Sequence, residues 1–317
     1  MKLHRAAPAV ALCCALSALA ADTKFISIAT GGTGGAYFPI GAALADVINN
    51  KLTGYNASAE VTAASKVNCI NVSQGKSDLA FVLGDTLSFA YTGDKAGGFT
   101  VPLKNLRALA NIYANTIQIV ARKDSGIVKL ADLKGKRVSV GAPGSGTEIN
   151  ARQILAAAGM SYSDFAKTDY LSFSESADQM KNRAIDATLI SSGMPNPGIM
   201  DIATSQEITV VAIDGPVRDK LTKELPFFLA TTIPKGTYRG QDHDVHTVGV
   251  ANFIIARAEM DEKTAYEMTK AIFENLDRLS QAHAAAKDIK LANAMKGLPV
   301  PVHPGAEKYY REKKLLK

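Results

Sequence analysis

Short apolar runs alternate with helical patterns along most of the chain. An apolar run at residues 25–29 predicts a strand, and the segment from Ile40 predicts a helix because its apolar residues recur at i, i+4, i+7 and i+8. Further strands are predicted at 56–61, 79–83, 137–141, 187–190 and 209–213. A helical pattern covers 261–283, and the lysine-rich C-terminal tail is expected to lie in solvent. This alternation predicts α/β domains with largely parallel sheets.

Two extended stretches, near Ile117 and near Val248, are candidates for hinge strands that cross between two lobes. On this interpretation, residues 21–116 together with 248–317 form lobe I, and residues 117–247 form lobe II. We therefore expect two α/β lobes that rotate about the two crossing strands and close on a ligand.

A glycine-rich stretch, Thr30-Gly31-Gly32-Thr33-Gly34-Gly35-Ala36-Tyr37-Phe38-Pro39, connects the first strand to the first helix. Its glycines permit a positive φ and let a ligand approach main-chain N–H groups closely. Pro39 suits the first turn of a helix, whose positive end then faces the loop. The stretch predicts a site for a carboxylate or a phosphate, and the alternative is a tight turn that binds nothing.

A second turn of the same design, Ala142–Glu148, precedes another helix. Ser145 and Glu148 have the spacing of a capping box, and Ser65 is placed to cap a shorter helix. Ligands of such sheets bind beyond the carboxyl ends of the strands, so we expect the two turns to face one ligand from opposite sides. Ser65, Ser145 and Thr147 are either ligand contacts or only helix caps.

Motifs of nucleotide-binding and nucleophilic sites are missing from the sequence. The turns contain neither Gly-x-x-x-x-Gly-Lys-Ser/Thr nor Gly-x-Gly-x-x-Gly, and no Gly-x-Ser-x-Gly occurs. The alternative of a periplasmic lyase or dehydratase needs an acid and a base, and the carboxylates nearest to the expected pocket are Asp85 and Glu148. His243 and His246 lack a third ligand nearby, so neither a metal site nor a cofactor is predicted.

The first 20 residues have the pattern of a cleaved secretory signal. Lys2 and Arg5 precede an uncharged apolar run that ends in Ala18-Leu19-Ala20, an Ala-x-Ala cleavage site. The run is shorter than the roughly 20 residues of a membrane span. A lipid anchor at Cys13 or Cys14 is disfavoured because neither cysteine follows a small residue. We therefore expect a periplasmic protein.

Composition removes further classes of function. Losing the two cations Lys2 and Arg5 lowers the net charge from +6 to +4, and no block of lysine and arginine with interleaved aromatics occurs, so no nucleic-acid partner is expected. Cys69 is then the single cysteine, which excludes an internal disulfide. The sensing domain of a regulator would predict a DNA-binding or transmembrane segment, and the sequence has neither.

Three motifs together carry a family resemblance: Gly31 to Pro39, Thr62-x-x-Ser65-x-x-Asn68, and Leu133 to Thr147. Further similarity lies at 233–238 and 247–251. With these motifs the mature chain resembles the TAXI family (TRAP-associated extracytoplasmic immunogenic proteins) of solute-binding proteins. The resemblance implies a type II periplasmic-binding-protein fold that captures glutamate or a related dicarboxylate. The implied partner is the membrane subunit of a TRAP-type secondary transporter, with small and large subunits fused.

The resemblance also implies a ligand pocket. Its residues include both turns, the segment after Thr62 and the loop from Ser191 to Pro195. The expected ligand-binding residues are Gly32, Thr33, Gly34, Gly35, Tyr37, Thr62, Ser65, Asn68, Ser145, Gly146, Thr147, Ser192 and Pro195. Tyr37 either lines the pocket and contacts the ligand, or packs in the core between the lobes.

This chain departs from the family pattern after Thr62, where relatives often read Thr-Gly-Gly-Ser-Val-Glu-Asn. Ala63 and Ala64 replace the two glycines, while Lys66 and Val67 replace valine and glutamate. Loss of the acid and gain of a cation favour a ligand without an amine, such as a simple dicarboxylate. Lys66 and Arg183 are candidate cations for such a ligand.

Overall fold

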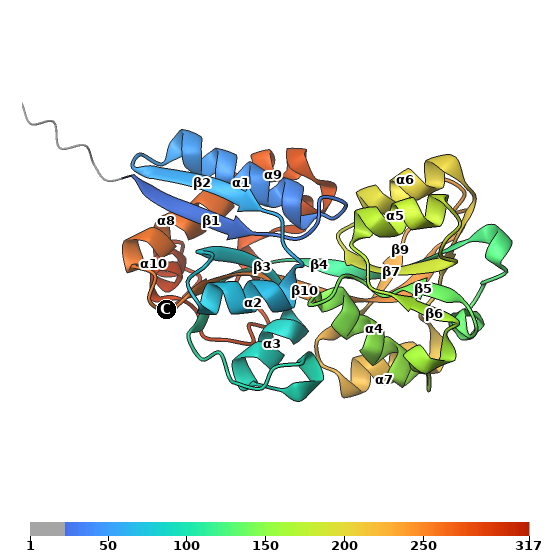
Figure 1. The fold of residues 1–317 in the computed structure, drawn as a ribbon. Helices are drawn as coiled ribbons and strands as arrows, with labels where there is room; N and C mark the ends of the chain where they lie inside the picture. Colours follow the sequence, from blue (N-terminus) through green and yellow to red (C-terminus); the bar gives the residue numbers. More distant parts are fainter. Residues whose placement is uncertain (1–22, 317) are drawn as a thin grey trace, which may run out of the picture.

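Two α/β lobes lie side by side and are joined by two long strands in the computed structural model, which describes residues 23–316 (Figure 1). The predicted signal segment, residues 1–20, lies outside the described residues. Within residues 23–316, no helix combines the length and the apolar character that a membrane span requires.

Lobe I is built from strand, turn and helix units. Its elements are β1 (Lys24–Ala29), α1 (Tyr37–Lys51), β2 (Tyr55–Glu60), α2 (Ser65–Ser73), β3 (Leu79–Leu83), α3 (Gly84–Thr92), α8 (Glu262–Phe273), α9 (Leu276–Ala282) and α10 (Pro304–Glu312). Strands β1, β2 and β3 are parallel, so the turns that follow them lie at one edge of the sheet. Helix α1 buries the apolar face that its spacing predicts, with Ile40, Leu44 and Ile48 nearly inaccessible to solvent.

Lobe II repeats the same design. Its elements are β5 (Arg137–Ser139), α4 (Gly146–Ala157), β6 (Lys167–Asp169), α5 (Phe173–Lys181), β7 (Ala187–Ser192), α6 (Pro197–Ser205), β8 (Ile208–Val211), α7 (Gly215–Glu224) and β9 (Phe228–Ile233). Strand β5 is parallel to both β6 and β7. The predicted strands therefore form, although β5 and β8 are each shorter than the sequence pattern suggests.

Strands β4 (Leu106–Arg122) and β10 (Val245–Arg257) connect the lobes. They pair with each other from Leu106 opposite Arg257 to Thr116 opposite Gly249. Beyond that point β4 pairs with β7 and β8, and β10 pairs with β9. The sheet order is β2-β1-β3-β10-β4-β7-β5-β6, with β8 added to β4 and β9 to β10. We place the boundary between the lobes at this exchange of partners.

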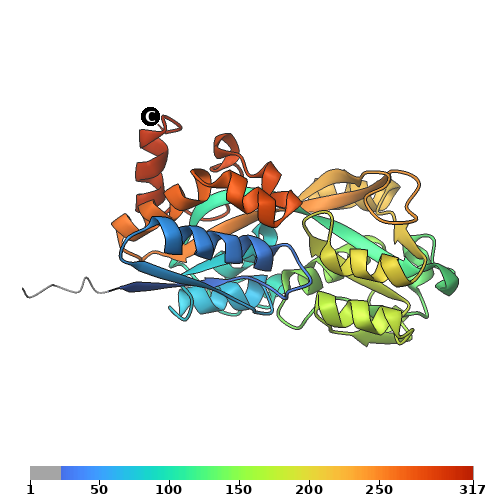
Figure 2. The same cartoon turned by 90° about the horizontal axis from the view of Figure 1, so that it is seen from above.

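The C-terminal segment contradicts the expectation that it lies in solvent. Helix α10 packs against α8, and its Tyr309 and Tyr310 belong to the core of lobe I. Gly305 permits this approach, since a Cβ there would lie 2.2 Å from the carbonyl oxygen of Glu262. The lysines of this tail obscure a buried aromatic pair in the sequence pattern. Figure 2 shows α10 at the lobe I end of the molecule.

The pattern predicted one helix over 261–283, but the structure contains two. Helix α8 ends at Phe273 and α9 begins at Leu276, with Asn275 between them in a non-helical conformation. The break lets both helices keep an apolar face on the same core, because Ile272 and Leu279 are each buried there.

Candidate ligand-binding site between the lobes

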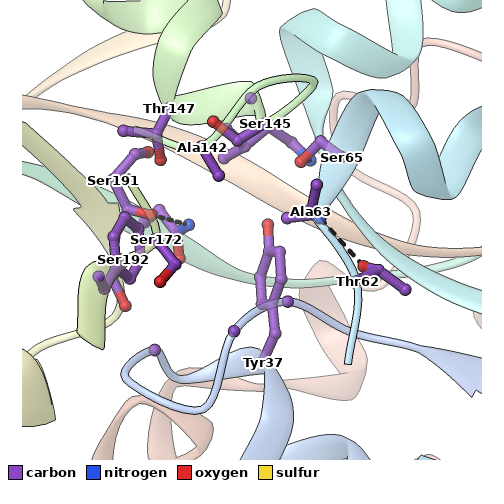
Figure 3. Close-up of a pocket in the computed structure, with 18 of the residues that line it drawn as sticks. Tyr37, Thr62, Ala63, Ser65, Ala142, Ser145, Thr147, Ser172, Ser191 and Ser192 are labelled. Atoms are coloured by element: carbon purple, nitrogen blue, oxygen red, sulfur yellow. Dashed lines mark hydrogen bonds between the residues drawn. The ribbon is translucent and has the colours of Figure 1, made fainter. Parts of the chain in front are cut away.

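A cavity of about 530 Å³, counted with the solvent at its mouth, lies between the lobes (Figure 3). Lobe I and the crossing strand β4 contribute Gly31, Gly32, Gly35, Ala36, Tyr37, Thr62, Ala63, Ala64, Ser65, Leu83 and Asn115. Lobe II contributes Ala142, Ser145, Gly146, Thr147, Ser172, Phe173, Ser191 and Ser192. The part of it that the centre of a water molecule can reach is about 50 Å³, so the enclosed space is small.

The lining carries many small polar groups. Hydroxyls and an amide alternate with glycine and alanine, and none of these lining residues is Lys, Arg, His, Asp or Glu. Tyr37 is the one titratable residue among them, and burial raises its pKa well above the ordinary value, so its hydroxyl is neutral. A charged solute in this cavity would therefore meet dipoles and N–H groups rather than a full opposite charge.

Four helices begin at the cavity wall, two in each lobe. The first residues of α1 and α2 line it from lobe I, and those of α4 and α5 from lobe II. Ser145 caps α4 by accepting from the N–H of Glu148 at 3.1 Å, and Ser172 caps α5 from Glu175 in the same way. Helix N-termini present unpaired N–H groups and the positive end of the helix dipole, so together they favour an anion.

A chain of hydrogen bonds crosses the floor of the cavity. The Tyr37 hydroxyl donates to Oδ1 of Asn252 at 2.5 Å, and Nδ2 of Asn252 donates to Oδ1 of Asn115 at 2.8 Å. Nδ2 of Asn115 then donates to the carbonyl of Ser191 at 2.9 Å. This chain joins α1 to β7 through both crossing strands, and it fixes the orientation of the Tyr37 ring and of the Asn115 amide.

The Ser191 hydroxyl is a buried lining group without a hydrogen-bond partner among the described residues. The residue is only 4% exposed to solvent. A buried hydroxyl without a partner costs about 1–3 kcal/mol. A ligand atom in the cavity would remove that cost. In Figure 3 Ser191 lies across the cavity from Ser65 and Thr62.

Several residues predicted from the sequence line the cavity: Gly32, Gly35, Tyr37, Thr62, Ser65, Ser145, Gly146, Thr147 and Ser192. Two of them use their hydroxyls within lobe I. Thr62 Oγ1 donates to Oδ1 of Asn68 at 2.6 Å and accepts from the Ala64 N–H at 3.0 Å. Ser65 accepts from the N–H of Leu83 at 3.0 Å, so it ties α2 to the end of β3 and does not cap its own helix.

Thr33 and Gly34 lie outside the cavity. Thr33 is exposed, and its Oγ1 lies 3.5 Å from the Oγ of Ser174 in lobe II. The Gly34 carbonyl accepts from Nδ2 of Asn196 in lobe II at 3.0 Å. This part of the first turn therefore contacts the other lobe, because the turn projects across the mouth of the cavity.

Asn68 and Pro195 also lie outside the cavity. Asn68 is buried and donates from Nδ2 to the carbonyls of Thr30 and Phe81 at 2.7 and 2.8 Å, so it joins the ends of two strands. Pro195 follows a cis peptide bond, and its backbone faces the ring of His283 in lobe I. Neither residue is part of the cavity lining.

The candidate cations are not at the cavity. Nζ of Lys66 lies 5.7 Å from the centroid of the Phe99 ring, and Arg183 pairs with Asp124 on lobe II. The expectation that Lys66 or Arg183 adds positive charge to the pocket is corrected by this placement. The side chain of Lys66 points away because α2 turns its first residue, Ser65, toward the cavity.

The sequence reasoning missed part of the lining. Ser172 has the same Ser-x-x-Glu spacing as Ser145, so a search for capping boxes would have found it. Asn115 gave no such signal. It lies within a long strand in which apolar and polar residues do not alternate regularly around it, so the sequence does not indicate which way its side chain faces. Its position in the cavity depends on how β4 pairs with β10.

The lobes touch each other around the cavity, so the structure is closed. The contacts between them include a bond from the Ala36 N–H to Ser192 Oγ at 3.3 Å and one from the Val67 N–H to the Gly144 carbonyl at 3.3 Å. Other contacts between the lobes are Asp85 with Asn150, Arg152 with the Ala96 carbonyl, and the ring of Phe89 with that of Phe227.

The other candidate chemistries lack a suitable arrangement. Glu148 is paired with Arg152 at 2.9 Å and accepts from the Tyr162 hydroxyl at 2.9 Å, so its carboxylate is engaged away from the cavity. His243 and His246 bond to different neighbours. Within residues 23–316, no cluster of three or more His, Cys, Asp or Glu side chains is placed to hold a metal ion.

Comparison with solved structures shows the class of fold. A protein from Bordetella bronchiseptica RB50 is 17% identical, with a TM-score of 0.59 over 92% of this chain and 99% of that one. PhnD1 from Prochlorococcus marinus (MIT 9301), solved in complex with methylphosphonate, is 12% identical, with a TM-score of 0.55 over 93% and 100%. The periplasmic binding protein BugD is 10% identical, with a TM-score of 0.55 over 92% and 94%. The fold is that of the type II periplasmic binding proteins, as the family resemblance implied.

The family follows from the sequence itself. Residues 28–313 match the model of the NMT1-like family, and the chain belongs to that family. The match covers both lobes and the two crossing strands, so the whole described fold corresponds to one family unit.

Proposed function

We propose that the protein is an extracytoplasmic solute-binding protein that captures a small anionic solute in the cavity between its lobes. The observation that carries this proposal is the convergence of four helix N-termini on a cavity whose lining has hydroxyl and amide groups but no charged side chain. Fixed N–H dipoles stabilise an anion without a neighbouring cation. The fold, with two lobes closed around the cavity, supports capture by rotation about β4 and β10.

The proposed ligand class is a carboxylate, glutamate or a related dicarboxylate. Helix N-termini on both walls suit a solute with an anionic group at each end. An ammonium group would need a carboxylate partner, and the lining offers none, while Asp85 is fully buried behind the wall. We therefore place a dicarboxylate without an amine ahead of glutamate.

The proposed partner is the membrane subunit of a TRAP-type secondary transporter. The motifs at Gly31–Pro39 and 133–147 support assignment to the TAXI group, which is a finer statement than membership of the NMT1-like family. The signal pattern of residues 1–20 supports export to the periplasm before cleavage.

An enzyme on the same fold is the competing proposal, and the site favours binding. A lyase or dehydratase needs an acid and a base within reach of the substrate. In the lining, Tyr37 alone titrates, and its proton is directed to Asn252. The cavity thus offers an anion site without an acid and base pair.

A thermal-shift screen with glutamate, 2-oxoglutarate, succinate, methylphosphonate and glucose tests the proposal. A solute at 100 times its dissociation constant stabilises the folded protein by about 2.7 kcal/mol, which a melting curve resolves. We expect the largest shift with a dicarboxylate that lacks an amine. A shift with glucose and with none of the anions would overturn the anion site, and a larger shift with glutamate would overturn the preference within the class.

A further inference from the structure

A buried hydrogen bond joins the two lobes directly behind the cavity wall. Asp85 lies on α3 of lobe I and Asn150 on α4 of lobe II, and both are 0% exposed. Nδ2 of Asn150 donates to Oδ2 of Asp85 at 2.7 Å. Two residues before Asp85, Leu83 lines the cavity, and so does Thr147, three residues before Asn150. The contact therefore depends on the same approach of the lobes that encloses the cavity.

The Asp85 carboxylate is buried with neutral partners only. Its other donors are the N–H of Thr86 at 2.6 Å and the Thr86 hydroxyl at 3.2 Å. The titratable groups that face it from α1 and α2 are Tyr37 and Cys69, and burial raises the pKa of each, so both are uncharged. A buried carboxylate without a cation is costly, and its neutral form is correspondingly favoured.

The remaining neighbours of this pair are also uncharged. Helix α4 presents Asn150 and, 3.5 Å from its amide, Gln153. Strand β10 presents Phe253 against Gly84, the residue before Asp85. Oδ1 of Asn150 has no hydrogen-bond partner among the described residues. A protonated Asp85 would supply the missing donor once the amide turned over.

We propose that Asp85 and Asn150 are positioning residues for closure, and that their contact makes closure take up a proton on Asp85. This inference rests on the proposed function in one respect, namely that opening about β4 and β10 separates α3 from α4. In the open state Asp85 is hydrated as an ordinary carboxylate. In the closed state it is buried against Asn150, so the closed state holds the proton more tightly.

The sign of the pH effect follows from linkage. Burial raises the pKa of Asp85 to about 6 in the closed state, while hydrogen bonds from Thr86 and Asn150 partly oppose the rise. A hydrated aspartate has a pKa of about 3.9. Closure is therefore favoured as the pH falls. The gain in closure free energy is complete below the pKa of Asp85 in the open state, and it vanishes above the pKa of Asp85 in the closed state. Between pH 7.5 and 5.0 the affinity should rise about tenfold.

Calorimetric titration with 2-oxoglutarate tests the contact in the ligand-bound protein. Titrations at pH 6 in buffers of different ionisation enthalpy should show proton uptake on binding. Asp85→Asn should abolish that uptake, and its affinity should stay near that of the wild type at pH 5.0 at every pH. Asn150→Ala leaves the carboxylate without its lobe II donor, so binding should weaken most at pH 7.5. Asp46→Asn, which removes a surface carboxylate paired with Arg278, is the matched control and should behave as wild type. Equal proton uptake by wild type and Asp85→Asn would overturn the proposal.

A ligand-free arm separates failure of the contact from failure of the proposed function. Fluorophores on Asn50→Cys and Lys220→Cys, exposed positions on the two lobes, report the distance between the lobes by energy transfer. We expect transfer to increase from pH 7.5 to 5.0 in the wild-type background and to stay constant with Asp85→Asn. A constant signal in both backgrounds overturns the proton-linked closure even where 2-oxoglutarate binds. A pH-dependent signal that Asp85→Asn removes supports proton-linked closure even where no carboxylate binds. Lack of carboxylate binding would itself overturn the proposed ligand. Circular dichroism confirms that each variant is folded.

Discussion

The two glycine turns that face each other across the cavity use glycine for different physical reasons. At the second turn, Gly141 just before it and Gly144 within it have φ values of 98° and 77°, which other residues rarely adopt. In the first turn none of the glycines has a φ in the left-handed region. Gly34 is required there because lobe II approaches, since a Cβ on it would lie 2.9 Å from the backbone nitrogen of Ser174.

The comparison separates a backbone requirement that exists within one lobe from a requirement that exists only on closure. The positive φ of Gly141 and Gly144 shapes the entry into α4, and this requirement exists in any arrangement of the lobes. The requirement at Gly34 exists only when the lobes are closed. Substitutions at Gly34 and at Gly141 should therefore affect different measurements.

The largest expected effect comes from Gly34→Val. The added side chain meets Ser174 and Phe173 of lobe II, so the open protein should fold normally while the closed arrangement becomes inaccessible. We expect the affinity for the proposed dicarboxylate ligand to fall at least 100-fold, roughly 2.7 kcal/mol, with little change in the melting temperature of the ligand-free protein. Calorimetric titration and thermal unfolding measure the two quantities. Unchanged affinity would show that the turn does not contact lobe II in the bound state.

Gly141→Ala should lower the stability of the ligand-free protein, which Gly34→Val leaves unchanged. The residue needs φ 98°, and a Cβ there would lie 2.8 Å from Cβ of Thr147 in the same lobe. Strain of this kind costs on the order of 1–3 kcal/mol, so we expect the free energy of unfolding to fall by about 2 kcal/mol. Urea denaturation of the ligand-free protein measures it. A variant with wild-type stability and weaker binding would show that Gly141, like Gly34, is required for closure rather than for the fold of its own lobe.

Ser191→Ala tests whether the free hydroxyl on the lobe II wall is reserved for the ligand. The substitution removes a buried oxygen without a partner, so stability should not fall. Affinity for the proposed dicarboxylate ligand should fall about tenfold through loss of a hydrogen bond to a charged group. Thr188→Val is the matched control, because Thr188 lies on the same strand and its buried Oγ1 also lacks a partner, but it does not line the cavity. Equal effects of the two variants on affinity would contradict a ligand contact at Ser191.

The smallest expected effect is a gain in stability from Ala64→Gly. Ala64 has φ 68° and ψ −147°, a conformation that favours glycine, and it lies on the lobe I wall at the start of α2. Relief of this strain exceeds the added flexibility of the unfolded chain, so we expect a gain of about 1 kcal/mol. A lower melting temperature for the variant would show that the Ala64 conformation is not strained.

The architecture was predictable from sequence because its signals are local. Strand β3 matches the predicted run at 79–83, and Ser145 caps α4 as its spacing indicates. The predicted capping box is only half formed, because the Glu148 carboxylate pairs with Arg152. Tyr309 and Tyr310 show the limit of such signals, because a lysine-rich segment hides the contact of α10 with α8 that buries both. The helix break near Asn275 was missed for another reason, because the apolar spacing continues through it.

The site was predictable in outline but not in its chemistry. Ser65 was expected at the cavity and lies there, yet its hydroxyl bonds the N–H of Leu83, which no local pattern indicates. Thr33 and Gly34 were expected to contact the ligand, and they contact lobe II instead. Asn115 was not expected in the lining, and it lies there because β4 pairs with β10.

The sequence by itself determined the succession of strands and helices, the two glycine turns and the caps, because these depend on residues within a few positions of one another. Only the tertiary structure decided which glycine faces the other lobe, which hydroxyl remains free and which carboxylate is buried. Asp85 and Asn150 are 65 positions apart, and Tyr37 and Asn252 are 215 apart. The Tyr37–Asn252 contact exists only once lobe I has folded, and the Asp85–Asn150 contact only once both lobes have closed, which is why no pattern along the chain records them.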